Sequence, residues 1–510
     1  MEIYFLNLLL DLIIYASILL LVVYTYFSIC FNYWRDRKFP YLIPKFPLGN
    51  YQNVLCKYPG ATFENCNIYE EIRRKKHKFA GIFSITRPIL VIADPEIAKD
   101  ILVKDFDHFV DRGFYKTTHD PLSYTMFTMD GADWKKSRMA FSPSFTSGRV
   151  KAMIPLISSV SELMIKEIGD LATENADLDI KKLTTKFTIN SLASCALGIE
   201  PGNSSNTDIF AKMARKQFHC ENFTNSFRFT VLNKFPDFCS KLGLHLMDRE
   251  VGMFFETILQ DSIKYRKENN CTRSDMLELM VNLKKDTKLS SRPVTDNQLT
   301  AELLNFFIAA LDTSPNTISF TLFELARNPD IQERVREEIE EVLIGNDGVL
   351  NTDCLKQMKY LLQVINETLR IYPPLPNVER KCSKDYKISG TDLTIERGTS
   401  IIIPIYGIQR DPENFSIPEK FDPERFSDQN KVNMKSYTFL PFGIGPRSCV
   451  GLRFGLTMVQ IAVIDIIRRF KLSVSPTTKL PFEMDNRAFM LTVKCPILLK
   501  AEIIQNSAMQ

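Results

Sequence analysis

The sequence lacks the residue patterns that build the common metal and disulfide sites. It has only five histidines, all in the first half of the chain, and no HExxH pair of ligands. Its eleven cysteines are odd in number and include no CxxC pair, which argues against structural zinc and against a disulfide framework. We therefore expect most of the thiols to be small buried side chains in a reducing compartment.

An excess of charge of one sign is also missing. The 64 basic and 60 acidic residues leave a net charge of +4, and no tract interleaves basic with aromatic residues. This balance predicts no nucleic-acid partner. The chain also has no GxGxxG sequence, because the glycine-rich stretch that begins at Gly443 has Ser448 where the third glycine would stand. A dinucleotide-binding loop is therefore excluded at this position.

One long uncharged run is present near the N-terminus. Residues 12–34 carry no charge, and as a helix these roughly 23 residues span about 34 Å, enough to cross a bilayer core. Basic residues follow the run, so the positive-inside rule places the remaining chain in the cytosol. A cleaved signal peptide is not indicated, because the run is not followed by a small-residue cleavage site. We predict an uncleaved anchor at 1–34, with Tyr33 and Trp34 at the membrane interface; a buried core helix is the alternative.

The segment after the anchor is rich in proline. Pro40, Pro44 and Pro47 fix φ and exclude a helix, so residues 35–50 are predicted to form a semi-rigid extended linker. Beyond it we find no internal repeat and no second linker. Residues 51–510 are therefore predicted to form one domain, mainly α with small β-sheets (α+β).

The longest predicted helix covers residues 295–326. It is apolar over much of its surface and should be buried. Asp312 and Thr313 interrupt this pattern, and Pro315 has no N–H for the carbonyl of Leu311, so we expect a kinked or widened helix beside Thr313. A threonine bonded back to its own helix, beside a solvent-facing aspartate, explains the same residues equally well.

Two further motifs follow. ETLR places Glu367 and Arg370 on one helix face, and Arg425 of FDPERF is a second cation for the same carboxylate. Such a pair alone is typical of solvated helices. In PFGIGPRSCVGLRFG, Cys449 lies just before an apolar helix predicted at 452–470, where free N–H groups favour a thiolate. An ordinary packed cysteine explains neither the glycines nor Arg447.

Together these motifs resemble the cytochrome P-450 superfamily of haem-thiolate monooxygenases. PFGIGPRSCVG fits its haem-binding loop F-x-x-G-x-R-x-C-x-G, ETLR with PERF fits its Glu–Arg–Arg triad, and AALDTS fits its oxygen-binding helix. WKKSR and ERKC fit its propionate-binding patterns. The resemblance covers the chain after the anchor, and stretches such as FVDRG resemble insect microsomal detoxifying members. The chain departs from the family at Ala310, usually glycine, where a methyl group is expected to narrow the gap between helix and haem slightly. It also departs at Gln409, usually histidine, where we expect only a local hydrogen-bond change.

The resemblance implies a haem b between the long helix and the helix after the cysteine, with Cys449 as its iron ligand. It implies Thr313 and Asp312 as the catalytic pair that contacts oxygen and supplies protons, and a loop whose glycines let it approach the haem. The triad of Glu367, Arg370 and Arg425 is implied to be structural. The implied haem-contacting residues are Trp134, Arg138, Ala309, Thr313, Arg380, Pro441, Phe442, Gly443, Arg447, Cys449 and Gly451.

The implied activity is insertion of one oxygen atom of O2 into lipophilic small molecules. These would be xenobiotics such as plant toxins or insecticides, or endogenous lipids or hormones. The alternatives are a haem-thiolate isomerase or dehydratase that acts on peroxides without a reductase, and a non-catalytic haem or ligand carrier; the Asp312–Thr313 pair speaks against both. The implied substrate pocket is aromatic and is lined by Phe114, Phe127, Phe306, Phe307 and Phe489.

The implied electron source is a partner protein, because the chain has no flavin or nicotinamide motif. NADPH–cytochrome P-450 reductase is the expected donor, with cytochrome b5 as a second candidate. Lys135, Lys136, Arg447 and Arg453 are basic residues that would suit an acidic donor. The expected location is the endoplasmic reticulum membrane, with the catalytic domain on its cytosolic side and FPDFCSKLGLHLM as a second membrane contact.

Overall fold

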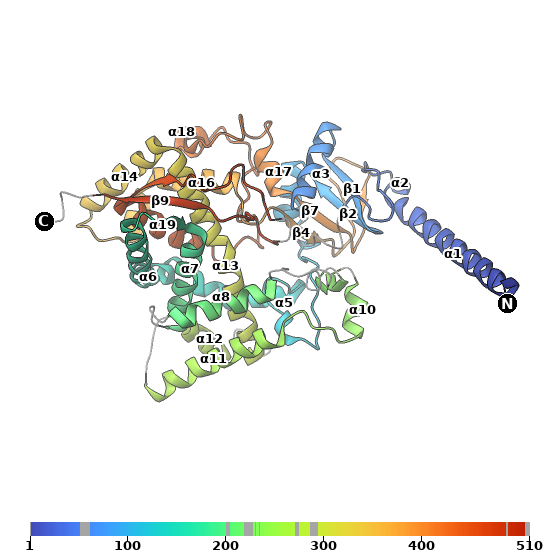
Figure 1. Ribbon diagram of the computed structural model, residues 1–510, viewed down its shortest axis with the longest axis horizontal. Helices are drawn as coiled ribbons and strands as arrows, with labels where there is room; N and C mark the ends of the chain where they lie inside the picture. The colour runs from blue at the N-terminus through green and yellow to red at the C-terminus, as the bar shows by residue number, and fades with distance from the viewer. Residues whose placement is uncertain are drawn as a thin grey trace.

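The structure, a computed structural model, describes residues 2–51, 62–199, 204–218, 228–229, 231–233, 235–270, 275–285, 294–485 and 488–504. Figure 1 shows a broad, mainly helical body with small sheets, from which the N-terminal helix α1 (Glu2–Phe31) projects. The predicted fold class, mainly α with small β-sheets, is confirmed. Among the described residues, one stretch, Tyr4–Asp36, is long and apolar enough to cross a membrane.

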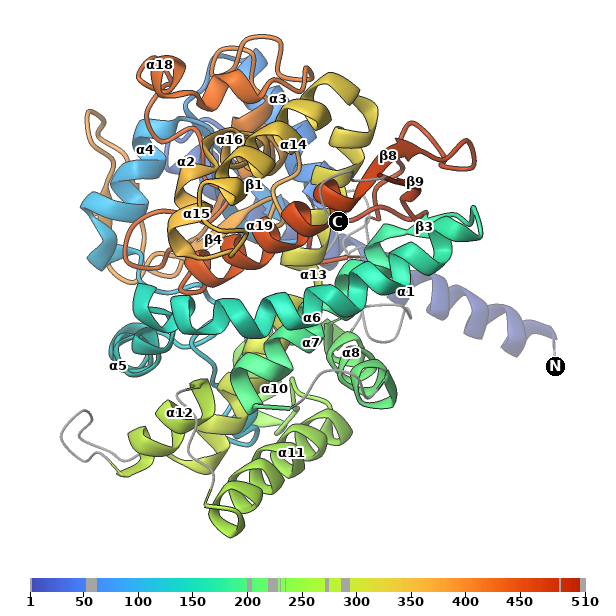
Figure 2. The same cartoon turned by 90° about the vertical axis from the view of Figure 1, so that its left-hand side faces the viewer.

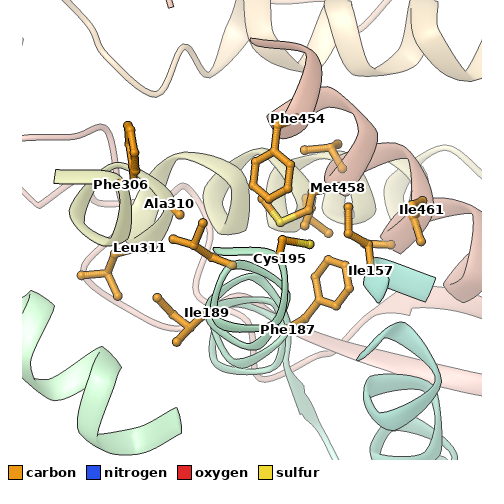
Figure 3. Close-up of a cluster of buried hydrophobic side chains, with 14 of the residues drawn as sticks. Ile157, Phe187, Ile189, Cys195, Phe306, Ala310, Leu311, Phe454, Met458 and Ile461 are labelled. Carbon is orange, nitrogen blue, oxygen red and sulfur yellow. The ribbon is translucent and has the colours of Figure 1, made fainter. Parts of the chain in front are cut away.

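Four long helices form the centre of the body: α6 (Ser147–Thr173), α7 (Ile180–Leu197), α13 (Asp296–Arg327) and α19 (Leu452–Arg469). Their apolar faces meet in one core, and Figure 3 shows Phe187 and Cys195 of α7 beside Phe454 and Met458 of α19. Burial of these faces, more than helix propensity, stabilises the four helices. The predicted bounds of α13 and α19 agree with the structure to within one residue, which is the usual uncertainty at a helix end.

The remaining helices pack around this centre. In both overall views α11 and α12 lie at one end of the body, α14 and α18 lie at the other, and α13 runs between them (Figures 1 and 2). The α-helices are α2 (Tyr33–Asp36), α3 (Thr62–Arg74), α4 (Pro95–Lys99), α5 (Gly131–Phe141), α8 (Ser204–Phe218), α10 (Pro236–Lys241), α11 (Arg249–Glu268), α12 (Met276–Lys285), α14 (Pro329–Ile344), α15 (Thr352–Gln357), α16 (Lys359–Ile371), α17 (Ile405–Arg410) and α18 (Asp428–Lys431). The short π- and 3-10 helices are η1 (Asp100–Lys104), η2 (Phe106–His108), η3 (Pro121–Ser123), η4 (Ser142–Phe145) and η5 (Pro423–Phe426).

Helix α13 is continuous through Pro315, and the kink or widening beside Thr313 stays a prediction. Thr295 caps its first turn, accepting a hydrogen bond from the backbone N–H of Gln298 at 3.2 Å. Proline removes one main-chain donor, but the residues around it are buried on neighbouring helices, and this packing holds the helix together. The polar residues Asp312 and Thr313 therefore lie on an unbroken, rigid helix.

The largest sheet has the strand order β1–β2–β7–β4, formed by β1 (Phe79–Ser84), β2 (Arg87–Ile92), β7 (Ser400–Ile403) and β4 (Val378–Lys381). Strands β2 and β7 are parallel, and the other two pairs are antiparallel. The smaller sheets consist of β3 (Leu178–Asp179), β9 (Leu498–Ile503) and β8 (Phe470–Val474), and of β5 (Tyr386–Lys387) and β6 (Thr394–Ile395).

Trp34 is part of this sheet's core, and its predicted place at the membrane interface is wrong. Its side chain is 1% exposed, and its indole Nε1 donates to the carbonyl of Ile82 at 3.0 Å. A Cβ on Gly81 would come within 2.3 Å of the indole ring. The proline-rich segment also pairs with β1. The N–H of Gly81 donates to the carbonyl of Pro40, and the N–H of Leu42 donates to the carbonyl of Gly81. The base of α1 is thus fastened directly to the sheet.

A buried ionic cluster joins α16 to the segment around η5. Arg370 donates to both carboxylate oxygens of Glu367, at 2.7 and 2.8 Å, and both side chains are fully buried. Arg425 lies 3.3 Å from the same carboxylate. Gln409 extends the cluster: its Oε1 accepts from the backbone N–H of Leu440 at 2.7 Å, and its Nε2 donates to two carbonyls of α16. Gln409 therefore connects α16 to the segment that leads into the cysteine loop.

We predict that Glu367→Gln strongly destabilises the protein. The substitution leaves Arg370 as a buried cation without its anion, which costs about 3–5 kcal/mol. The midpoint of urea denaturation, followed by circular dichroism, should fall accordingly. Glu396→Gln is the control because its pair with Arg37 is half exposed and should contribute at most about 1 kcal/mol. Equal midpoints for the two variants would contradict the assignment.

Candidate active site

A cavity of about 410 Å³ lies between α13 and the loop that precedes α19. Cys449 lines one side of it, and Ala309 and Thr313 of α13 also line it. A cavity of this size, with apolar walls and a few convergent polar groups, is typical of a ligand site. Every residue that the sequence assigned to the cofactor lines it: Trp134, Arg138, Ala309, Thr313, Arg380, Pro441, Phe442, Gly443, Arg447, Cys449 and Gly451.

The cysteine loop is held by its own backbone. The N–H of Cys449 donates to the carbonyl of Phe442 at 2.9 Å, which closes the loop. Gly443 and Gly445 both have positive φ, at 65° and 74°. Gly443 lines the cavity, as expected, but Gly445 serves a different contact: a Cβ there would come within 2.0 Å of the carbonyl oxygen of Leu102 in η1. Gly445 therefore lets the loop pack on η1, and its part in the approach of the loop to the haem stays a prediction.

Opposing influences act on the pKa of the Cys449 thiol. Burial raises its pKa, whereas the backbone N–H of Gly451 and the guanidinium groups of Arg138 and Arg112 lower it. Gly451 is the N-cap of α19, so the helix terminus supplies the donor that the sequence predicted. A bound metal ion would hold such a thiol as the thiolate.

Five arginines line the same cavity: Arg87, which donates to Asn233 and Ser400, and a group of four, Arg112, Arg138, Arg380 and Arg447. Sequence reasoning singled out Arg138, Arg380 and Arg447 but missed Arg112, which lies in the quoted stretch FVDRG. Burial lowers the pKa of Arg112 to about 10 and that of Arg447 to about 9, and each is lowered further by other arginines. Burial likewise lowers the pKa of Arg380. Glu379 opposes this lowering at Arg112, and Asp130 and Asp111 oppose it at Arg447, so the protein offsets part of the charge and the cluster can still accept a further anion.

The arginines donate hydrogen bonds to backbone carbonyls around the cavity, and two of them keep a donor without a partner among the described residues. Arg138 donates to the carbonyl of Ser448 at 2.8 Å, and Arg447 donates to the carbonyl of Met129. The Nε atoms of Arg380 and Arg447 are buried and have no hydrogen-bond partner in the described structure. Such orphaned donors cost free energy until an acceptor reaches them. The donors, the arginine charges and the single thiol fit a haem, whose two propionates and iron would satisfy them.

On α13, the side chains of Asp312 and Thr313 both have partners within the protein. Thr313 Oγ1 donates to the carbonyl of Ala309 at 2.6 Å, as the back-bonded alternative describes. Asp312 does not face solvent: its carboxylate lies 3.6 Å from the ammonium of Lys181 on α7. Lys181 also donates to Thr492 Oγ1. Sequence reasoning missed Lys181, because a lone lysine far away in the chain carries no signal of this contact.

The aromatic wall of the cavity is formed by Phe114, Phe127 and Phe489. The centroids of the first two rings lie 5.1 Å apart, and Phe489 lies 6.2 and 6.3 Å from them. Phe306 lines the cavity and packs on Phe145. The prediction for Phe307 is wrong, because its side chain is 0% exposed, stacks on Phe210 at 4.9 Å and so cannot reach the cavity.

The comparison with known families decides the identity. A family model described as Cytochrome P-450 matches residues 54–500, which include the cavity and the cysteine loop. The chain belongs to the cytochrome P-450 family. It is therefore a P-450 monooxygenase, an oxidoreductase, and the family implies a haem-thiolate cofactor.

Similar P-450 proteins come from insects. The chain is 37% identical to cytochrome P-450 6a2 of Drosophila melanogaster, over 93% of this chain and 96% of the relative. It is 35% identical to cytochrome P-450 6k1 of Blattella germanica, over 96% of each chain. A probable cytochrome P-450 6a14 of Drosophila melanogaster is also 35% identical, over 92% of this chain and 95% of the relative. These likenesses agree with the insect resemblance stated from the sequence.

We predict that Arg112→Leu makes this P-450 release haem faster. A hydrogen bond to a charged group contributes roughly 1.5–3 kcal/mol, so the loss should be roughly 10- to 100-fold faster. Transfer of haem to an excess of a haem-free globin measures the rate. Arg334→Leu is the matched control, since Arg334 is half exposed and pairs with Glu424 on the surface. Equal release rates for the two variants would exclude Arg112 from the haem site.

Proposed function

We propose that this P-450 is a membrane-anchored monooxygenase that oxidises lipophilic small molecules with electrons from NADPH, delivered by a reductase. The observation that carries the proposal is the composition of one cavity. Cys449 lines it on the α19 side, the Asp312–Thr313 pair lies on the α13 side, and aromatic rings form much of the rest. An oxidising centre, a proton supply and an apolar substrate site would thus share one enclosed space.

A bound haem supplies the oxygen binding and the oxidising power, and a cysteine ligand favours O–O cleavage. We assign to Cys449 the ligation of the iron, and to Arg112, Arg138, Arg380 and Arg447 the binding of the propionates. The indole of Trp134 stacks on Arg447, whose guanidinium carbon lies 4.3 Å from the ring centroid. This contact would keep Arg447 in place for the charged group.

Thr313 and Asp312 are assigned to proton supply. The Thr313 hydroxyl donates to Ala309, so its oxygen still has lone pairs that can accept a hydrogen bond from a water in the cavity. Rotation of the hydroxyl would turn its proton toward the cavity. Asp312 lies beside it and also lines the cavity, and its carboxylate lies 3.6 Å from the ammonium of Lys181. A carboxylate placed beside the cavity can pass protons through water.

Electron supply is assigned to an acidic partner that meets the thiolate side. Helix α5 carries Trp134 inward and exposes Lys135 and Lys136, and Arg453 of α19 is also exposed. Complementary charge of this kind steers association. Arg447 does not belong to this surface, because it is 3% exposed; the expectation that it meets the partner is therefore wrong. NADPH–cytochrome P-450 reductase is the proposed donor, and cytochrome b5 is a second one.

The proposed location is the endoplasmic reticulum membrane, with α1 as the anchor and the catalytic body in the cytosol. Helix α1 is apolar and exposed along its length, as a lipid-facing helix would be. Phe235, Phe238 and Leu242, at and beside α10, are exposed apolar side chains. They support the second membrane contact that the sequence suggested, from which lipophilic substrates would enter.

Labelled oxygen tests the proposed function. The full-length protein, purified with haem, is combined with the reductase, NADPH and labelled O2, and a panel of lipophilic compounds is screened by mass spectrometry. We expect products with one labelled oxygen atom that form only when NADPH and reductase are present. Products formed from peroxides without O2 or reductase would instead establish an isomerase or dehydratase, and the lack of any product would support a carrier.

We predict that Thr313→Ala uncouples NADPH consumption from product formation. Without the hydroxyl, proton supply in the cavity fails, so product per NADPH should fall several-fold while peroxide release rises. Thr321→Ala is the matched control, because Thr321 is bonded back to the carbonyl of Thr317 on the same helix but is fully buried outside the cavity. Unchanged coupling in Thr313→Ala would contradict the assigned role.

A further inference from the structure

One face of α13 is open to the cavity, and it contains an amide. In the stretch from Ala301 to Leu311 only Asn305 and Ala309 are not buried, and both line the cavity. Asn305, Ala309 and Thr313 are four residues apart and therefore share one helix face. At 1.5 Å per residue, Asn305 lies about 12 Å along the helix from Thr313. A polar group thus faces the cavity two turns away from the proposed oxidation site.

The orientation of this amide is set by a buried acid that the proposed mechanism does not use. Glu302 is 0% exposed, and its Oε2 accepts a hydrogen bond from Asn305 Nδ2 at 3.3 Å. Its other oxygen, Oε1, accepts from the backbone N–H of Met126 and from Ser137 Oγ, the latter at 2.9 Å. An ionised carboxylate can only accept, so the N–H₂ of Asn305 must point at Glu302. The carbonyl oxygen of Asn305 then remains available to accept a hydrogen bond in the cavity.

The acid is also fixed to the elements that surround the haem site. Met126 precedes Phe127 of the aromatic wall, and Ser137 lies on α5 between Trp134 and the end of that helix. Burial raises the pKa of Glu302 to about 7. Its three hydrogen bonds lower the pKa and so oppose part of this rise. Above pH 7 the carboxylate form, and hence the orientation of the amide, therefore predominates.

We infer that Asn305 is a specificity-determining residue that accepts a hydrogen bond from a hydroxyl group of the substrate, and that Glu302 is the residue that positions its amide. The preferred substrates are lipophilic molecules with a hydroxyl at one end, oxidised at a position distant from it. This inference rests on the proposed function, because it assigns one end of the same substrate cavity. The aromatic wall holds the apolar body, and the amide selects the orientation.

Matched ligands test this selectivity without turnover. The haem-loaded full-length protein is titrated at pH 8 with 4-alkylphenols of increasing chain length and with their methyl ethers, and the ligand-induced change in haem absorbance gives each Kd. The ether keeps the shape but lacks the donor. We expect the phenol to bind roughly 2- to 10-fold more tightly than its ether, as one neutral hydrogen bond allows. Equal affinities in the unmodified protein would overturn the inference.

Three variants separate recognition from packing. Asn305→Leu should abolish the preference for phenol while ether binding changes little. Glu302→Gln keeps the acceptor for Met126 and Ser137 but places an N–H₂ opposite Asn305, so the amide turns and offers a donor to the cavity. This variant should lose the phenol preference and bind a 4-alkylacetophenone, a pure acceptor, more tightly. Asn377→Leu is the control, because Asn377 also lines the cavity, and it should keep the preference.

Each outcome has a definite meaning. A phenol preference that survives Asn305→Leu, or that disappears in Asn377→Leu, contradicts the inference. Should Glu302→Gln fail to retain haem, Asn305→Leu and Asn377→Leu still decide the role of Asn305. The proposed function fails separately: if the unmodified protein forms no oxygenated product from any compound, the monooxygenase proposal is wrong, whereas products from hydrocarbons with no phenol preference contradict only the inference on Asn305.

Discussion

The convergence of four buried guanidinium groups on one cavity is the constraint on which the rest of the site depends. Arg112, Arg138, Arg380 and Arg447 come from separate segments of the chain, and the carboxylates of Glu379, Asp111 and Asp130 only partly offset their charge. Burial lowers the pKa values of all four, and neighbouring arginines lower those of Arg112, Arg380 and Arg447 further, so the arrangement is unfavourable for the protein alone. The two propionates of a bound haem would relieve this repulsion, and haem binding would therefore be coupled to the stability of the folded chain.

The scaffold keeps these groups in place through buried polar contacts. The Glu367–Arg370 ion pair stabilises α16. Gln409 connects this helix to Leu440, one residue before the cysteine loop begins, by accepting a hydrogen bond from its N–H. On the other side of the cavity, Glu302 joins α13 to α5 and to the segment before the aromatic wall. Fully satisfied buried networks rigidify a structure, and partly satisfied ones destabilise it. The site is thus rigid on both faces, as positioning of a cofactor and a substrate requires.

Much of the fold and of the site could be predicted from local sequence. Apolar spacing predicted α13, and the resemblance of the cysteine loop predicted Cys449 as the iron ligand. Contacts between distant segments could not be predicted. Lys181 reaches Asp312 only because α7 packs on α13, and Trp34 is buried only because the chain after the anchor pairs with β1. The error at Phe307 has a geometric cause, since consecutive helix residues point about 100° apart and Phe306 occupies the direction of the cavity.

The central claim is that Cys449 ligates a haem held by the buried arginines, and the reduced carbon monoxide difference spectrum tests it most directly. We expect the unmodified protein to show the long-wavelength Soret band of a thiolate-ligated haem. Cys449→Ser should lack this band, while Cys382→Ser, which alters a buried thiol in the sheet core, should retain it. A thiolate band in Cys449→Ser, or its absence from the unmodified haem-loaded protein, would contradict the account.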